Sequence, residues 1–258
     1  MATPDEWSIR FVPISKPQLL VAQNSEHPEL PSLPYSELVL SPSSNFRGYC
    51  GEEFHGLVVA TNSGLKEVNS SNLGALPENI HLSVQVQSET DAVKSYPSTS
   101  HRITPEQPFA TSAVSFPLKS AGKWQIRALL QIDHELETQR VVRTFDIDVS
   151  PAVRILFKVS RGSPSLGAHV LEAQVENCSD SILCIESCEL TPRNGWHVES
   201  INGTQPLPSP VILRPHEIHQ FCFLLRDGRS AEAAVLVVGW RREPVGSKGW
   251  QTTRAVRI

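Results

Sequence analysis

The chain has 258 residues, of which 20 are proline, and a formal net charge of −4 at pH 7. This length is sufficient for two domains of ordinary size, each with its own hydrophobic core. The charge argues against a general nucleic-acid binder, because Lys and Arg are not in excess. No stretch approaches the roughly 18 consecutive apolar residues of a membrane-spanning helix, so no transmembrane segment is predicted.

The first half of the chain predicts a β-sandwich preceded by a polar segment. Residues 1–35 mix Pro, Ser, Asn and Glu with little periodicity, so we expect a tail or an extended segment lying against the first domain. Within residues 36–150, apolar and polar side chains alternate at 80–87, 124–132 and 144–149. A period of two is typical of antiparallel strands with one polar face, and no helical stripe separates these runs.

The pattern restarts after Val149-Ser150-Pro151, which we interpret as the domain junction because proline cannot continue a strand ladder. Residues 151–258 then predict a second sandwich, which begins with an alternating strand at 153–159. The predicted fold is therefore all-β, with two consecutive immunoglobulin-like antiparallel β-sandwich domains.

The stretch 169–196 carries the clearest pattern of the second domain. Apolar residues alternate with Glu172, Gln174 and Glu176, and turn-forming side chains follow at 177–180. A second β-rich run at 182–190 completes what we predict to be a hairpin. Three tryptophans are predicted to anchor the core, namely Trp196, Trp240 and Trp250.

No residue pattern supports an enzyme. Gly-x-Ser-x-Gly, Walker and His-Glu-x-x-His motifs do not occur in the sequence. His216 and His219 have a spacing that suits a metal only on a helix, whereas their surroundings predict loop and strand. Glu52 and Glu53 are consecutive in a predicted strand and are interpreted as a solvated edge. We therefore predict no catalytic, cofactor-binding or metal-binding residues.

The five cysteines are odd in number, and the N-terminal residues lack an apolar core of signal-peptide length. We interpret the cysteines as reduced thiols in a cytoplasmic protein. Cys184 and Cys188 are predicted to share one face of a strand, too far apart for a disulfide and buried as small apolar side chains.

Three segments resemble a known family in the same order along the chain. Gly51-Glu52-Glu53-Phe54 resembles the Gly-Glu-x-Phe segment of trafficking protein particle (TRAPP) complex subunit 13. The stretch 171–177 is similar to that family's Leu-Glu-Ala-x-(Ile/Val)-Glu-Asn motif, with Cys188-Glu189-Leu190-Thr191-Pro192 following it. The closing residues resemble its Trp-Arg … Gly … Gly-x-Leu-Gln-Thr segment, with Trp250 in place of the usual Leu, at Gly239-Trp240-Arg241, Gly246, Gly249 and Gln251-Thr252.

The resemblance implies a non-catalytic accessory subunit of a vesicle-tethering complex that promotes nucleotide exchange on a Rab GTPase. Such a subunit would act in ER–Golgi transport and autophagy by docking to other TRAPP subunits. It would be cytoplasmic, would reach Golgi or autophagic membranes only through the complex, and would bind neither nucleic acid nor a small-molecule substrate. The candidate partner-binding residues are Glu172, Glu176 and Trp240.

Two other interpretations remain open. One is a cytosolic arrestin-like adaptor of two sandwiches, which would bind the tails of membrane proteins. The other is an extracellular adhesion fragment, which the cysteine count and the N-terminal sequence disfavour.

Overall fold

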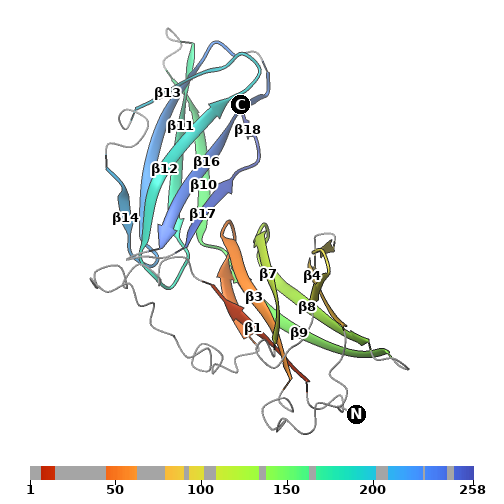
Figure 1. Ribbon diagram of the computed structural model, residues 1–258. Coiled ribbons are helices and arrows are strands. Elements are labelled where there is room, and N and C mark those ends of the chain that lie inside the picture. The colour runs from red at the N-terminus through yellow and green to blue at the C-terminus, as the bar shows by residue number, and fades with distance from the viewer. Residues whose placement is uncertain are drawn as a thin grey trace, which may run out of the picture. The chain divides into compact units, whose positions relative to one another are not determined.

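Figure 1 shows the computed structural model of the chain, in which every regular element of the described residues is a β-strand. The all-β prediction is therefore confirmed, while the immunoglobulin-like subtype stays a prediction. The described residues are 7–14, 45–62, 79–89, 93–101, 109–133, 138–162, 167–201, 209–228, 230–242 and 247–258.

The chain divides into two compact units. Unit 1 comprises Met1–Gly48 and Phe54–Val149, and unit 2 comprises Tyr49–Glu53 and Ser150–Ile258. This division differs from the predicted domains at Tyr49–Glu53, a short segment that we assigned to the first domain and that makes its contacts with unit 2. The division into domains at 36–150 and 151–258 stays a prediction.

Unit 1 contains a three-stranded and a six-stranded antiparallel sheet. The first has the order β1-β3-β7, and the second has the order β2-β9-β8-β4-β5, with β6 also pairing with β4. The strands are β1 (Trp7–Pro13), β2 (Asn45–Tyr49), β3 (Glu53–Asn62), β4 (Asn79–Ser88), β5 (Lys94–Ser95), β6 (Thr99–His101), β7 (Phe109–Pro117), β8 (Gly122–Asp133) and β9 (Thr138–Ser150).

The alternation in the sequence explains the core of unit 1. On β4 the apolar positions are fully buried and lie opposite buried positions of β8, as in the pair Leu82 and Leu130.

Strand β1 lies within the segment predicted as a tail or extended segment and pairs with β3 along its whole length. Its alternation places Trp7, Ile9 and Phe11 in the interior. Phe11 packs against Phe46, Phe54 and Phe145, with ring centroids 5.1 to 5.8 Å apart.

Unit 2 contains two further antiparallel sheets. A four-stranded sheet has the order β10-β11-β15-β13, and a five-stranded sheet has the order β14-β12-β16-β17, with β18 also pairing with β16. The strands are β10 (Val153–Arg161), β11 (Ala168–Asn177), β12 (Leu183–Pro192), β13 (His197–Ser200), β14 (Val211–Leu213), β15 (Ile218–Arg226), β16 (Glu232–Arg242), β17 (Lys248–Thr252) and β18 (Val256–Arg257).

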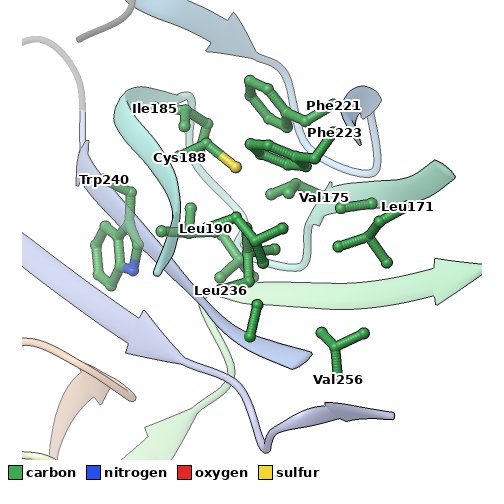
Figure 2. Close-up of a cluster of buried hydrophobic side chains, with 14 of the residues drawn as sticks. Leu171, Val175, Ile185, Cys188, Leu190, Phe221, Phe223, Leu236, Trp240 and Val256 are labelled. Atoms are coloured by element: carbon green, nitrogen blue, oxygen red, sulfur yellow. The ribbon is translucent and has the colours of Figure 1, made fainter. Parts of the chain in front are cut away.

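The core of unit 2 lies between these two sheets. Figure 2 shows Phe223 of β15 and Val175 of β11 beside Leu190 of β12 and Leu236 of β16. Apolar side chains from both sheets face each other, so the two inner faces bury a single hydrophobic cluster.

The predicted hairpin at 169–190 is wrong in its pairing, although both strands exist. Strand β11 pairs with β10 and β15, whereas β12 pairs with β14 and β16. The turn therefore carries the chain from one sheet to the other. Asn177 explains this crossover: its buried amide donates to the carbonyls of Ser181 (2.8 Å) and Leu213 (3.0 Å), and its oxygen accepts the backbone N–H of Ser179 (2.9 Å).

Candidate docking site

The outward surface of β11 carries two of the three predicted partner-binding residues. Glu172 and Glu176 lie on the side of the strand opposite the buried Leu171 and Val175. Their neighbours on β10 and β15 extend the same outward surface. We call this surface the β11 face and define it as Arg154, Leu156, Lys158, Glu172, Gln174, Glu176, Ile218, Gln220 and Cys222.

The charges of the β11 face are matched across neighbouring strands. Arg154 donates from Nε to the Glu176 carboxylate at 2.8 Å, and this hydrogen bond raises the pKa of the arginine. Glu172 lies opposite Lys158 in the register of the two strands. Leu156 of β10 is 56% exposed. Matched charges around exposed aliphatic side chains can contact another protein.

Trp240, the third predicted partner-binding residue, lies in the core of unit 2. It is only 1% exposed and belongs to the hydrophobic cluster between the sheets. Gly249 packs directly against its ring, and a Cβ at that glycine would overlap the indole. This burial argues against a partner-facing role, because a partner could reach the ring only by opening the core.

Trp250 was predicted to anchor the core, and this prediction is wrong. Its side chain is 56% exposed. The register of β16 and β17 explains the difference, since Gly249 lies opposite the inward Trp240 and Trp250 lies opposite Gly239 on the outer side. The indole lies over Gly239, where no side chain would separate it from the strand.

Glu52 was predicted to be solvated, but it is 3% exposed and its carboxylate is held in unit 2. Nε of Arg242 lies 2.9 Å from its Oε1, and the backbone N–H of Tyr49 donates to its Oε2 at 3.0 Å. The Tyr49 ring also lies against the Arg242 guanidinium, and its hydroxyl donates to Asp180 at 2.6 Å. We call Tyr49–Glu53 the anchor segment.

Two of the resembling segments meet at this point. The backbone N–H of Trp250 donates to the carbonyl of Gly51 at 3.1 Å, and Glu52 forms an isolated bridge with Gly249. Gly51 has a φ of 97°, and a Cβ there would overlap the Trp250 carbonyl oxygen. Sequence reasoning missed this contact because the two segments are far apart in the chain. The Gly-Glu pair directly after a short strand was the available signal.

The buried Glu52 carboxylate predicts a pH dependence of stability. Burial raises the pKa of Glu52 above its ordinary value, and this effect exceeds the opposing effects of Arg242 and the Tyr49 N–H. In the pH window between the two pKa values, the folded state binds more protons than the unfolded state. Stability should therefore fall as pH rises through that window, and the full penalty applies above the folded pKa.

Urea denaturation of the wild type and of Glu52→Gln between pH 7 and pH 5 would measure this effect. The glutamine variant is the control, because it cannot ionise. The stability of the wild type relative to this variant is expected to rise as pH falls. A relative stability that stays constant or moves in the opposite direction would contradict the assignment.

His216 precedes β15 and His219 lies within it, while Cys184 and Cys188 both lie on β12. His216 lies in a turn with a φ of 66°, and His219 packs edge-on against Phe221. Within the described ranges, no group of three or more His, Cys, Asp or Glu side chains could hold a metal ion.

All five cysteines are thiols. A bulge between Ile185 and Ser187 puts Cys188, but not Cys184, in the core cluster, so their predicted shared face is wrong.

No helix among the described residues is long and apolar enough to cross a membrane.

No family model matches the chain. A probable trafficking protein particle complex subunit 13 homolog of Caenorhabditis briggsae is 26% identical over 211 residues, which are 80% of this chain and 49% of the relative. A protein of the same description from Caenorhabditis elegans is 24% identical over 198 residues, covering 75% and 47%. The predicted family resemblance is confirmed. The chain spans about half the length of these two curated relatives.

Two bacterial macroglobulins are among the solved structures found in the comparison. Native Escherichia coli alpha-2-macroglobulin matches 83% of this chain and 16% of its own length, with a TM-score of 0.44 and 11% identity. Salmonella alpha-2-macroglobulin reacted with methylamine matches 84% and 16%, with a TM-score of 0.43 and 12% identity.

Proposed function

We propose that the chain is a non-catalytic docking subunit of a TRAPP-type tethering and Rab nucleotide-exchange complex. It acts in ER–Golgi transport and autophagy, on the cytoplasmic side, and is held at Golgi or autophagic membranes by the other subunits. Two relatives that are probable trafficking protein particle complex subunit 13 homologs match three quarters or more of this chain, and they support the proposal.

The observation that carries the proposal is where the structure places the residues that resemble TRAPP subunit 13. The buried Glu52 carboxylate is paired with Arg242, Gly249 packs under Trp240, and Asn177 fixes the crossover between the sheets. Each of these residues, apart from Arg242, lies within a segment used for the resemblance. Residues that carry the resemblance therefore also make close contacts within unit 2, and this supports the proposal.

The β11 face is the proposed docking surface. Ion-paired carboxylates and exposed aliphatic side chains suit a protein partner, and aliphatic groups can be buried at the centre of an interface while the charges set its specificity. Nucleotide exchange would then be carried out by other subunits.

Reversing both carboxylates, Glu172→Lys with Glu176→Lys, is expected to lower co-purification with tethering-complex subunits from cells. The remaining recovery should become more sensitive to salt, because charges at an interface set its electrostatic complementarity. Folding should be little affected, because Arg154 is largely exposed to water and exposed ion pairs contribute little to stability. Quantitative mass spectrometry of the purified complex would measure the recovery.

Two control variants separate docking from folding. Adding Arg154→Glu to the double variant restores an ion pair of opposite sense, so a stability effect would be reversed while a docking effect would remain. Glu189→Lys changes an exposed carboxylate on the other sheet and should leave recovery unchanged. Full recovery with the folded double variant would move the interface away from the β11 face. Recovery of membrane-protein cargo in place of tethering subunits would favour the arrestin-like adaptor.

A further inference from the structure

Strand β10 is the long open edge of unit 2 within the described residues. It has nine residues and stands at the end of the four-stranded sheet. The edges formed by β13 and β14 have only four and three residues. The edge of β17 is covered by the anchor segment, through the bridge from Glu52 to Gly249.

The hydrogen-bond pattern shows which backbone groups of β10 face outward. At the two ends of the β10–β11 ladder, Gly162 donates to the carbonyl of Ala168 and Cys178 donates to that of Ala152, each at 2.8 Å. Bonded pairs alternate along an antiparallel ladder, so even-numbered residues of β10 bond to β11. The N–H and C=O groups of the odd-numbered Ile155, Phe157 and Val159 therefore point away from the sheet.

Two apolar side chains at the middle of this edge are incompletely covered. Leu156 is 56% exposed and Phe157 is 39% exposed, and as consecutive strand residues they lie on opposite faces of the sheet. Ile155 and Val159 flank Phe157 on the inner face and pack against the core. An additional strand beside β10 would cover Phe157 on one face and Leu156 on the other.

The charges of β10 all have the same sign. Arg154, Lys158 and Arg161 are exposed, and the strand contains no acidic residue. Glu172 and Glu176 balance Lys158 and Arg154 only from the β11 side of the strand. An incoming strand would meet the cations from the other side, and acidic residues would complement them there. Pairing with a second copy of β10 would instead bring three cations from each copy together.

We propose that the open edge of β10 binds an extended segment of a partner protein in which aliphatic and acidic residues alternate. The segment adds a strand to the four-stranded sheet through the outward backbone groups of Ile155, Phe157 and Val159. Its aliphatic residues lie beside Phe157 on the inner face, and its acidic residues lie beside Arg154 and Lys158 on the outer face. This binding site rests on the geometry of β10 alone and does not depend on the family assignment.

A fluorescent nine-residue peptide of alternating Val and Glu is the probe, and a peptide of alternating Val and Lys is its control. We expect the whole chain to bind the acidic peptide at least roughly tenfold more tightly than the basic one in fluorescence anisotropy. Hydrogen exchange at the odd-numbered amides of β10 should slow when the acidic peptide is bound.

The variant Phe157→Pro tests the backbone contact. Proline removes an N–H that faces away from β11, so the existing ladder is kept while the added strand loses a donor and meets the proline ring. Affinity for the acidic peptide should fall roughly tenfold or more. Phe157→Val keeps the N–H and should bind within about threefold of the wild type. Far-UV circular dichroism would confirm that both variants are folded.

Several results would overturn the proposal. These are equal binding of the acidic and basic peptides, unchanged binding by folded Phe157→Pro, and the absence of wild-type binding at millimolar peptide. A wild-type dimer in sedimentation that Phe157→Pro converts to monomer would assign the edge to a second copy of the chain.

Discussion

Replacing Trp196 with alanine is expected to lower the free energy of unfolding of unit 2 by about 3–5 kcal/mol. The side chain is buried in the cluster between the two sheets, and its indole N–H donates to the carbonyl of Ser230 at 3.1 Å. Alanine would leave a cavity and a carbonyl without this donor, which together account for the large loss. Urea denaturation followed by far-UV circular dichroism would measure it.

Trp250→Ala is the matched control for this variant. It removes the same side chain from a position that is exposed over Gly239, so the loss should stay below about 1 kcal/mol. Similar losses at the two positions would show that burial does not separate them as described.

Asn177→Ala should destabilise unit 2 by about 3 kcal/mol or more, because several buried partners lose their hydrogen bonds at once. The amide donates to two carbonyls, and its oxygen accepts both the N–H and the hydroxyl of Ser179, the latter at 2.7 Å. These bonds hold the chain where it leaves β11 and enters the other sheet. Chemical denaturation would give the size of the loss.

The variant Asn177→Asp tests the same contacts in another way. A carboxylate can still accept from Ser179, but it would face the carbonyl oxygens of Ser181 and Leu213 without a proton to donate. The pKa of the new side chain should therefore be raised in the folded state, and part of the lost stability should return as pH falls. A loss at Asn177→Asp that is independent of pH would contradict the assigned donors.

The sequence predicts strands better than it predicts their partners. The alternation on β4, β8 and β11 identified the buried positions, since a period of two requires only neighbouring residues. The pairing of β11 was missed because a turn of Asn, Ser and Asp suits a hairpin and a crossover equally well. The buried Asn177 amide distinguishes the two cases, and its second partner, Leu213, is 36 residues away.

In the candidate docking site, the sequence likewise predicts the features set by neighbouring residues but not those set by distant ones. The outward position of Glu172 and Glu176 follows from alternation alone. The burial of Glu52 does not, because it depends on Arg242 and on the bridge to Gly249 in a distant part of the chain. Trp240 and Trp250 differ in exposure because the register of β16 and β17 places them on opposite sides of the sheet, which no local pattern shows.

The anchor segment also makes unit 2 discontinuous in sequence. Glu52 and Arg242 are 190 positions apart (242 − 52), and the greater part of unit 1 lies between the anchor segment and Ser150. Closing this loop carries an entropic cost that depends on the length of free chain within it. Prior folding of Phe54–Val149 would replace most of that free chain with a compact body. Unit 2 can therefore begin to fold from Ser150 onward as the chain is synthesised, but the anchor segment can reach its final position only after Arg242 and β17 have been made.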